Sequence, residues 1–368
     1  MNSRKRINKA LHHEEADRVS IQDVLWRSTI ERWKKEGLPD LPIEPEVEDY
    51  LGFEMSKFFP DLGPRLPREI LEQNEEYVIG RNSFGEIVKN HRDYSTTPQI
   101  IESPVRSQDD WKQFKKRLEP DKSRAISWRA IPEEDEVSGW QNELQRYHTA
   151  HQKGKFILYS AIIGYDCIQR YVGSERLLMA VVTQPEWVKE MYMTQAELVI
   201  AMFALMEEEG FKFDGVFLAS DLGYRNGPLF SPEHYKEQLF PADKVICEYF
   251  NKKDIPVIIH SDGYVKPLIP YFIKAGFSCL QPIEVKAGMD VRDLKREYGK
   301  EFAFWGGIDV NTMAHPDPQV IEKEIKSKFA VAKKDGGYIY HSDHSVPDNV
   351  TFQQYKRVLE LVHKYGKY

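Results

Sequence analysis

The sequence predicts an α/β protein whose parallel strands are joined by helices. Short apolar runs alternate with helical patterns along the second half of the chain, as in consecutive strand–helix units. Right-handed crossovers in series either close such a sheet into a barrel or leave it open and doubly wound. At 368 residues and 41% hydrophobic composition, the chain is long and apolar enough for one decorated domain of this kind.

Six runs after residue 150 have the length of strands and are apolar enough to be buried on both faces. They cover residues 156–163, 215–219, 256–260, 279–283, 302–305 and 337–341. Residues 18–24 are predicted as the first strand of the sheet.

Helices are expected between these strands, and several have recognisable ends. Ser231 supplies an N-cap, and Pro232 a first-turn proline. Asp290 begins a helix that ends at Gly299, and Gly276 closes another. Apolar periodicity predicts further helices over residues 174–184, 186–209 and 351–364.

The region 27–150 is less regular and is rich in proline, charge and tryptophan. We interpret it as an elaborated insertion with helices over 27–36 and 108–118 and a hairpin over 77–88 around Gly85. One further strand hidden in it would bring the sheet to eight. The whole chain, 1–368, is then a single domain, with the main strand–helix repeats in 151–368.

Composition and charge exclude several classes of protein. The net charge of -7 disfavours a nucleic-acid partner, and the three widely spaced cysteines form no disulfide or metal framework. The longest apolar run, 198–206, is far shorter than the ~20 residues of a membrane span, and no export signal precedes it. No glycine-rich phosphate loop is present. We expect a cytoplasmic protein that binds neither nucleic acid nor membrane.

Unusual polar residues follow the predicted strands, where active sites of barrels and doubly wound sheets lie. His260 and Asp262 share one face if their strand continues, because side chains alternate with period two. The last strand runs into His341, Ser342, Asp343 and His344. Histidines and carboxylates from separate strands can hold a catalytic zinc ion. The alternative is that these residues simply hydrogen-bond to one another or form a solvated loop.

Two acids occupy equivalent strand ends. Asp221 follows the run 215–219, and Glu284 follows 279–283, so that each is a candidate acid, base or ligand. Their alternative is a helix cap or a structural ion pair. Asp309 follows a pair of glycines and is expected to hydrogen-bond the turn, whereas Cys279 is expected to be a packed, inert thiol.

Aromatic and cationic residues near strand ends are candidates for substrate contacts. Tyr165 and Tyr224 could line a pocket for a flat substrate, although aromatic residues at strand ends are commonly core. Arg27 could hold an anionic group of a substrate, with a solvated surface position as the alternative. Trp305 is expected in the core.

Several short motifs, taken together and in order, resemble the uroporphyrinogen decarboxylase superfamily. They are His260-Ser261-Asp262-Gly263, Gln281-Pro282-Ile283-Glu284, Tyr298-Gly299, Gly306-Gly307-Ile308-Asp309 and Gly336-Gly337-Tyr338, preceded by Gly227-Pro228 and Ser231-Pro232. The resemblance covers roughly residues 155–365 and implies a (β/α)8 TIM barrel with its site at the C-terminal ends of the strands.

The resemblance is closer to the zinc- and corrinoid-dependent methyltransferases of this superfamily than to the decarboxylases. The decarboxylases carry Arg-Gln-Ala-Gly-Arg after the first strand, where this chain keeps only Arg27. They also carry a Gly-His-Gly segment, in which His344 matches the histidine while Asp343 and Ser345 replace both glycines.

The thiol methyltransferases of the superfamily hold zinc through a His-x-Cys pair and a distant cysteine. His260 matches the histidine, Asp262 replaces the first cysteine and His344 stands near the expected place of the last. The resemblance thus implies zinc on His260, Asp262 and His344, with Glu284 or Asp221 as proton donor. Oxygen and nitrogen ligands leave zinc more Lewis acidic, which favours a substrate with a methylated oxygen or nitrogen.

We therefore expect methyl transfer between a small methylated compound and a corrinoid on a separate partner protein, because the chain shows no corrinoid module of its own. Arg27, Tyr165, Tyr224 and Asp343 are the expected substrate contacts, and a homodimer is left open. The rival hypotheses are a porphyrinogen decarboxylase, which needs no metal, and a non-catalytic barrel that binds a small molecule. Residue spacing leaves open whether Asp343 or His344 faces the pocket, because neighbouring strand residues point to opposite sides.

Overall fold

The computed structural model describes residues 1–41, 44–92, 98–124 and 140–368. Its main sheet has eight strands in the order β1-β14-β13-β12-β11-β8-β7-β2, and every neighbouring pair in it is parallel. The strands are β1 (Ser20–Ile21), β2 (Met55–Phe58), β7 (Phe156–Ile162), β8 (Gly215–Ala219), β11 (Val257–His260), β12 (Cys279–Gln281), β13 (Ala303–Trp305) and β14 (Tyr338–Tyr340).

The two end strands of this order meet and close the sheet. The amide of Glu54, directly before β2, donates to the carbonyl of Ile21 at 3.0 Å. The amide of Met55 donates to the side-chain oxygen of Gln22 at 2.8 Å. The expected α/β barrel is therefore confirmed, and the strand hidden in the N-terminal region is β2.

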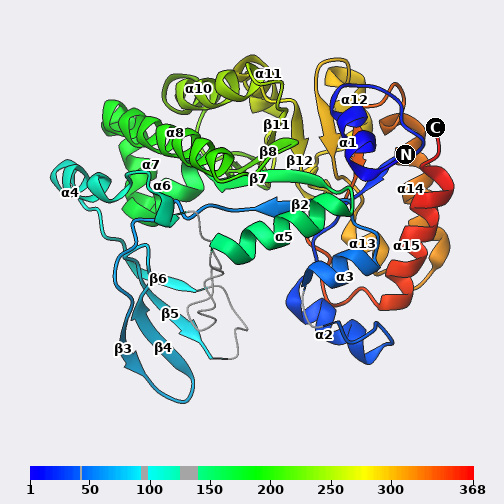
Figure 1. The fold of residues 1–368 in the computed structure, drawn as a ribbon, viewed down its shortest axis with the longest axis horizontal. Coiled ribbons are helices and arrows are strands. Elements are labelled where there is room, and N and C mark those ends of the chain that lie inside the picture. The colour runs from blue at the N-terminus through cyan, green and yellow to red at the C-terminus, as the bar shows by residue number, and fades with distance from the viewer. Residues whose placement is uncertain (42–43, 93–97, 125–139) are drawn as a thin grey trace.

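Helices surround the barrel (Figure 1). They are α1 (Ser3–Leu11), α2 (Arg27–Lys35), α3 (Glu44–Tyr50), α4 (Gln108–Phe114), α5 (Trp140–Gln152), α6 (Gly164–Val172), α7 (Ser174–Thr183), α8 (Pro185–Glu208), α9 (Pro232–His234), α10 (Phe240–Asn251), α11 (Ile269–Ala275), α12 (Val291–Tyr298), α13 (Val310–Met313), α14 (Pro318–Ala332) and α15 (Phe352–Tyr365). In the described part of the chain, no helix combines the length and the apolar character needed to cross a membrane.

The expected helix ends are confirmed at several positions. The side chain of Asp290 accepts from the amide of Arg292 at 2.8 Å, and Ser231 caps α9. Gly276 ends α11 with a left-handed φ of 106°, which glycine adopts without a Cβ penalty. Asp309 caps α13 through the amide of Asn311, as expected for a turn-stabilising residue.

The first strand is shorter than the predicted 18–24. β1 ends at Ile21, although the amide of Gln22 still donates to the carbonyl of Tyr340 at 3.2 Å. Gln22 accepts from the amide of Met55, and Asp23 accepts from the amide of Val24. The Asp23 side chain also accepts from the amide of Ser342, which follows β14, at 3.3 Å.

Along the inward faces of the strands, apolar side chains give way to polar ones at the C-terminal ends. Phe156, Ile258 and Ile339 belong to one buried cluster that also includes residues of α1. His260 follows Ile258 by two residues, and His341 follows Ile339 by two residues, so that each histidine lies on the same face as the isoleucine before it. On the faces of β11 and β14 that carry Ile258 and Ile339, the histidines therefore lie at the C-terminal ends of the strands.

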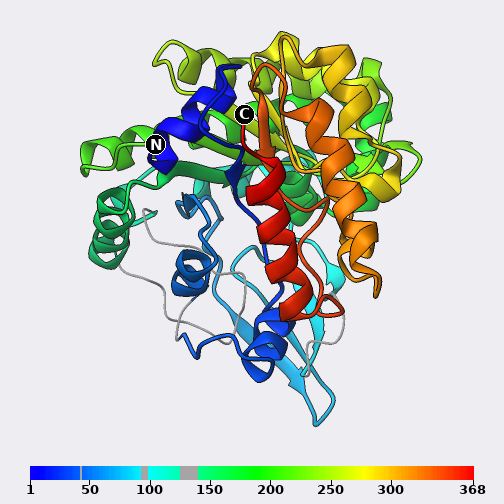
Figure 2. The ribbon, with the colours of Figure 1, turned by 90° about the vertical axis from the view of Figure 1, so that its right-hand side faces the viewer.

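The elaborated N-terminal region carries a second sheet, which projects away from the barrel (Figure 1). Its order is β3-β4-β5-β6, with all neighbours antiparallel, in β3 (Glu69–Gln73), β4 (Tyr77–Arg81), β5 (Ile87–His91) and β6 (Gln99–Glu102). The predicted hairpin is confirmed as β4 and β5. Figure 2 shows both chain ends on one side of the barrel, where the amide of Val19 donates to the carbonyl of Gly366 at 2.8 Å.

Candidate functional site

The site lies where two loops at the barrel mouth pack against each other. One loop follows β8 and includes the short hairpin β9 (Gly223–Tyr224) and β10 (Gly227–Pro228); the other follows β11. A Cβ on Gly263, whose φ is +83°, would lie 2.4 Å from the carbonyl carbon of Gly223. Only glycine permits this close approach, which brings Asp221 and Asp262 together.

Three potential ligand side chains converge there. One ligand atom each from Asp221, His260 and Asp262 lies within 4.8 Å of the other two. The Nε2 atom of His260 is 3.5 Å from Oδ1 of Asp221, which also accepts from the amide of Asp262 at 2.9 Å. The predicted pairing of His260 with Asp262 on one face is thus present in the structure, with Asp221 as an added neighbour.

One oxygen of this group is buried without a partner. Oδ1 of Asp262 has no hydrogen-bond donor among the described residues. Burial, followed by the charge of Asp221, raises the pKa of Asp262, while His260 opposes the shift. A buried carboxylate oxygen with no donor beside a second carboxylate is an arrangement that a bound cation would stabilise.

His344 approaches Asp262 from the last strand. Its Nε2 atom is 4.0 Å from Oδ2 of Asp262, and the ring of Trp26 stacks on it at a centroid distance of 6.1 Å. Asp343 points elsewhere: it is fully buried, and its oxygens accept from the amides of Val285 at 3.0 Å and Val310 at 2.9 Å. Of these two neighbours, His344 is therefore the one beside the candidate ligands.

A chain of side chains behind His260 fixes its orientation. Nδ1 of His260 contacts Oε1 of Gln281, and Nε2 of Gln281 lies 3.4 Å from Nε2 of His341. Burial lowers the pKa of His341, which favours a neutral ring. Such outer contacts set which nitrogen of a ligand histidine is available to a metal.

The two predicted catalytic acids differ in their surroundings. The Asp221 side chain is 43% exposed at the barrel mouth. Glu284 is 11% exposed, accepts from the amide of Gly263 at 2.6 Å and pairs with Lys286 at 3.1 Å. Glu284 therefore holds the turn that carries Asp262, while the side chain of Asp221 is accessible from solvent.

Asp166 is an acid of the site that the sequence reasoning missed. It lies in the first turn of α6, and its Oδ2 accepts from the amide of Asp221 at 2.7 Å. Burial, with the charge of Asp221 added, raises the pKa of Asp166 to about 7. It follows the predicted strand 156–163, so the strand-end rule that selected Asp221 and Glu284 would also have selected it.

The predicted substrate contacts are dispersed. Arg27 is 69% exposed at the start of α2 and pairs with Glu31 at 3.3 Å. Tyr165 is buried, with its hydroxyl against that of Ser174, and Tyr224 is exposed on β9. The expected core positions of Trp305 and Cys279 are confirmed, because both are fully buried.

A cleft of about 420 Å³ lies between the barrel mouth and the antiparallel sheet. Its barrel wall includes Asp166, Asp221 and His260. The opposite wall is one face of the sheet. Val88 and Asn90 alternate along β5, Glu86 continues this alternation directly before the strand, and Ile100 pairs with Val88. This alternation is visible in the sequence, but no sequence pattern indicated that this face meets the barrel.

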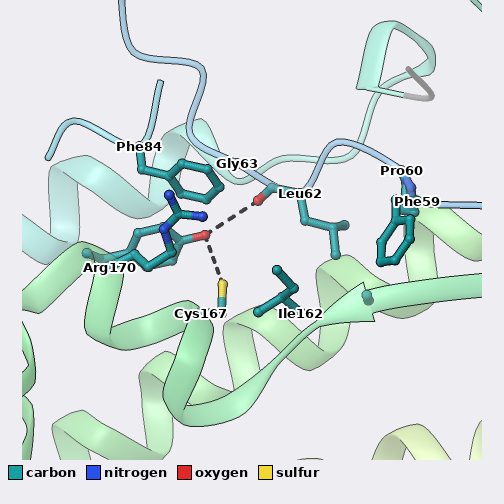
Figure 3. Close-up of a pocket in the computed structure, with 10 residues that line it drawn as sticks. Phe59, Pro60, Leu62, Gly63, Phe84, Ile162, Cys167 and Arg170 are labelled. Atoms are coloured by element: carbon teal, nitrogen blue, oxygen red, sulfur yellow. Dashed lines mark hydrogen bonds between the residues drawn. The ribbon is translucent and has the colours of Figure 1, made fainter. Parts of the chain in front are cut away.

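A smaller cavity of about 30 Å³ adjoins the cleft and shares Phe84, Ile162 and Arg170 with it (Figure 3). The guanidinium carbon of Arg170 lies 3.6 Å from the ring centroid of Phe84. Cys167 donates from its thiol to the hydroxyl of Tyr171 at 3.1 Å. The sheet is thus attached to α6 through Arg170, at the edge of the cleft.

The chain is similar in sequence to one known family. The family model described as Uroporphyrinogen decarboxylase (URO-D) matches residues 169–365, more than half of the chain. The uroporphyrinogen decarboxylase of Trichlorobacter lovleyi is 26% identical over 147 residues, which are 38% of this chain and 39% of that protein. That of Vesicomyosocius okutanii is 28% identical over 79 residues, which are 22% of this chain and 23% of that protein. The matched segments therefore span well under half of these curated relatives.

A solved structure described as a methyltransferase from Methanosarcina mazei has the same fold. Its TM-score is 0.65 at 15% sequence identity, and the alignment covers 99% of both chains. The similarity extends over the N-terminal region as well as the strand–helix repeats.

Proposed function

This chain belongs to the uroporphyrinogen decarboxylase (URO-D) family, and from that premise we propose that it is a zinc-dependent methyltransferase. It would move a methyl group between a small methylated oxygen or nitrogen compound and a corrinoid carried by a partner protein. The observation that carries the proposal is the convergence of Asp221, His260 and Asp262 within 4.8 Å, with Oδ1 of Asp262 buried and lacking a donor in the described part of the chain.

The residues present fit a zinc ion. His260 and Asp262 would be two of its ligands, and the third would be Asp221 or His344, which both lie beside Asp262. Three protein ligands and an open position are typical of catalytic zinc. Bound there, zinc would supply a Lewis acid that polarises the oxygen or nitrogen carrying the methyl group.

The remaining residues of the site would orient the reacting groups. Gln281 holds the His260 ring, and Glu284 holds the turn that carries Asp262. Asp221 is the exposed acid at the barrel mouth, so that it can hold or donate a proton to the leaving heteroatom when it is not a ligand. The cleft of about 420 Å³ is of the size that small-molecule sites have.

Elemental analysis of the protein purified without added metal tests the proposal. We expect near-stoichiometric zinc in the wild type and its loss in His260→Gln and Asp262→Asn. The matched controls are His315→Gln and Asp293→Asn, which change exposed residues of the same types. His344→Gln and Asp221→Asn then identify the third ligand.

Two results would count against the zinc site. One is the absence of zinc from the wild type even after it is added back, and the other is equal zinc in every variant. Either result would favour the decarboxylase hypothesis over the methyltransferase hypothesis. With zinc present, methyl transfer is assayed by incubating methylated ethers and amines with a corrinoid protein and following demethylation of the substrate.

A further inference from the structure

A relay of hydrogen-bonding groups runs from the backbone after β14 to the candidate ligand His260. The carbonyl oxygen of Ser342 contacts Nδ1 of His341, and Nε2 of His341 lies 3.4 Å from Nε2 of Gln281. The side-chain oxygen of Gln281, Oε1, contacts Nδ1 of His260. Ser342, His341 and Gln281 are buried, whereas His260 is 23% exposed and lines the cleft. The relay thus leads from the interior of the protein to a side chain at the cleft.

The backbone end of the relay decides where the proton of His341 lies. A carbonyl oxygen can only accept, so that Nδ1 of His341 carries the proton of its bond to Ser342. A second acceptor, Oδ1 of Asp23, lies 3.5 Å from the same nitrogen. Burial lowers the pKa of His341, which favours a ring with a single proton. Nε2 of His341 is then an acceptor, and the amide nitrogen of Gln281 donates to it.

The same reasoning places the proton of His260. Because the amide nitrogen of Gln281 donates to His341, its oxygen is the atom that faces His260. That oxygen can only accept, so that Nδ1 of His260 donates to it. In a neutral ring, Nε2 of His260 then carries a lone pair and no proton. A neutral histidine in water favours the opposite arrangement, with its proton on Nε2, so that the relay reverses the intrinsic preference of the ring.

The unprotonated nitrogen lies close to a carboxylate. Nε2 of His260 is 3.5 Å from Oδ1 of Asp221. Two acceptors with no proton between them repel each other, and a cation bound to both removes that repulsion. Two atoms bound at about 2.0–2.1 Å to a tetrahedral zinc ion are separated by roughly 3.3 Å, which is close to this distance. The spacing therefore agrees with a metal ion bound by both atoms.

We propose that His341 and Gln281 are positioning residues, which hold the proton of His260 on Nδ1 and thereby present an unprotonated Nε2 to the metal. The inference rests on the proposed function for the metal itself, whereas the position of the proton is a property of the metal-free chain. Both residues act through His260. Groups that hydrogen-bond to a ligand histidine typically change metal affinity roughly 10–100-fold when they are replaced.

Nitrogen NMR of the metal-free full chain, labelled at its histidines, tests the position of the proton. Spectra at pH 8, above the usual histidine pKa of about 6.5, distinguish a protonated ring nitrogen from an unprotonated one. The signals of His260 are those missing from His260→Gln, and we expect its proton on Nδ1. His315 is an internal control with the opposite arrangement, because its Nδ1 accepts from the amide of Asp317 at 3.1 Å. A proton on Nε2 of His260 would overturn the proposal.

The variant His341→Leu tests the relay itself. Without the acceptor of His341, the Gln281 amide can turn its nitrogen towards His260, which moves the proton of that ring to Nε2. Adding Gln281→Glu should return the proton to Nδ1, because a carboxylate can only accept. An unchanged proton position in His341→Leu would refute the role of His341. If that variant does not fold, Gln281→Met removes the acceptor of His260 directly, and an unchanged proton position there would refute the relay.

Zinc affinity of the same proteins is measured by competition with a chelator. Gln281→Met and His341→Leu should bind zinc roughly 10–100-fold more weakly than the wild type, and Gln281→Glu should restore binding to His341→Leu. The matched control is Gln238→Met, which changes an equally buried glutamine whose amide donates to the carbonyl of Val181 at 2.8 Å. Full zinc affinity with the proton on Nε2 would refute this inference alone. The expected proton position in a wild type that binds no zinc would refute the zinc site and confirm the relay.

Discussion

Asp243 provides a quantitative test of how burial sets the pH dependence of stability. It lies in α10, is 6% exposed and accepts from the hydroxyl of Tyr235 at 2.6 Å. Burial raises the pKa of Asp243 to about 7, and the hydrogen bond from Tyr235 offsets part of that shift. An aspartate in an unfolded chain ionises near pH ~3.9.

The sign follows from proton binding. Between about pH 4 and pH 7 the folded state binds a proton at Asp243 that the unfolded state has lost, so that the free energy of unfolding falls as pH rises. This contribution is fully present below pH ~4 and absent above pH ~7. Each pH unit inside the window is worth about 1.4 kcal/mol, which gives a loss of roughly 2.5 kcal/mol between pH 5 and pH 8.

The perturbation is Asp243→Asn, which keeps an acceptor for Tyr235 and cannot ionise. Urea unfolding at pH 5 and pH 8 measures the difference in unfolding free energy between variant and wild type. That difference should move in favour of the variant by roughly 2.5 kcal/mol from pH 5 to pH 8. Glu248→Gln, on the exposed side of the same helix, should show no such change. A pH-independent difference for Asp243→Asn would refute the reasoning.

Three further predictions follow from contacts described above. Asp343→Ala should lower the free energy of unfolding by about 3 kcal/mol in a urea titration, because the amides of Val285 and Val310 lose their acceptor. Thr351→Ala should cost about 1 kcal/mol in the same assay, because it removes the capping box of α15. A thiol reagent should detect no reactive cysteine until urea unfolds the protein, since all three thiols are buried; they are Cys167, Cys247 and Cys279.

The strand–helix repeats were predictable because each strand there is buried on both faces and therefore reads as a continuous apolar run. The predicted run 215–219 coincides with β8, and 256–260 differs from β11 by one residue. Strand β2 was not identifiable in the same way. It is four residues long and contains Lys57, so that its apolar signal is too short to stand out.

The candidate site was predictable only in part. Alternation was enough to place His260 and Asp262 on one face, because both belong to one strand and its extension. The approach of Asp221 depends on the contact of Gly223 with Gly263, which joins two loops far apart in the sequence. The choice between Asp343 and His344 depends on a shift of one residue at the strand end, which no periodicity resolves.

The antiparallel sheet lies between β2 and β7, so that one wall of the cleft is encoded in a single stretch of chain between Phe58 and Phe156. The ligand candidates are encoded elsewhere, in the loops after β8, β11 and β14. Recombination within that stretch would therefore replace one wall of the cleft and leave the candidate ligands unchanged. In such a chimera, the incoming segment would need a carboxylate at the position of Glu86 to keep the ion pair with Arg170 of α6.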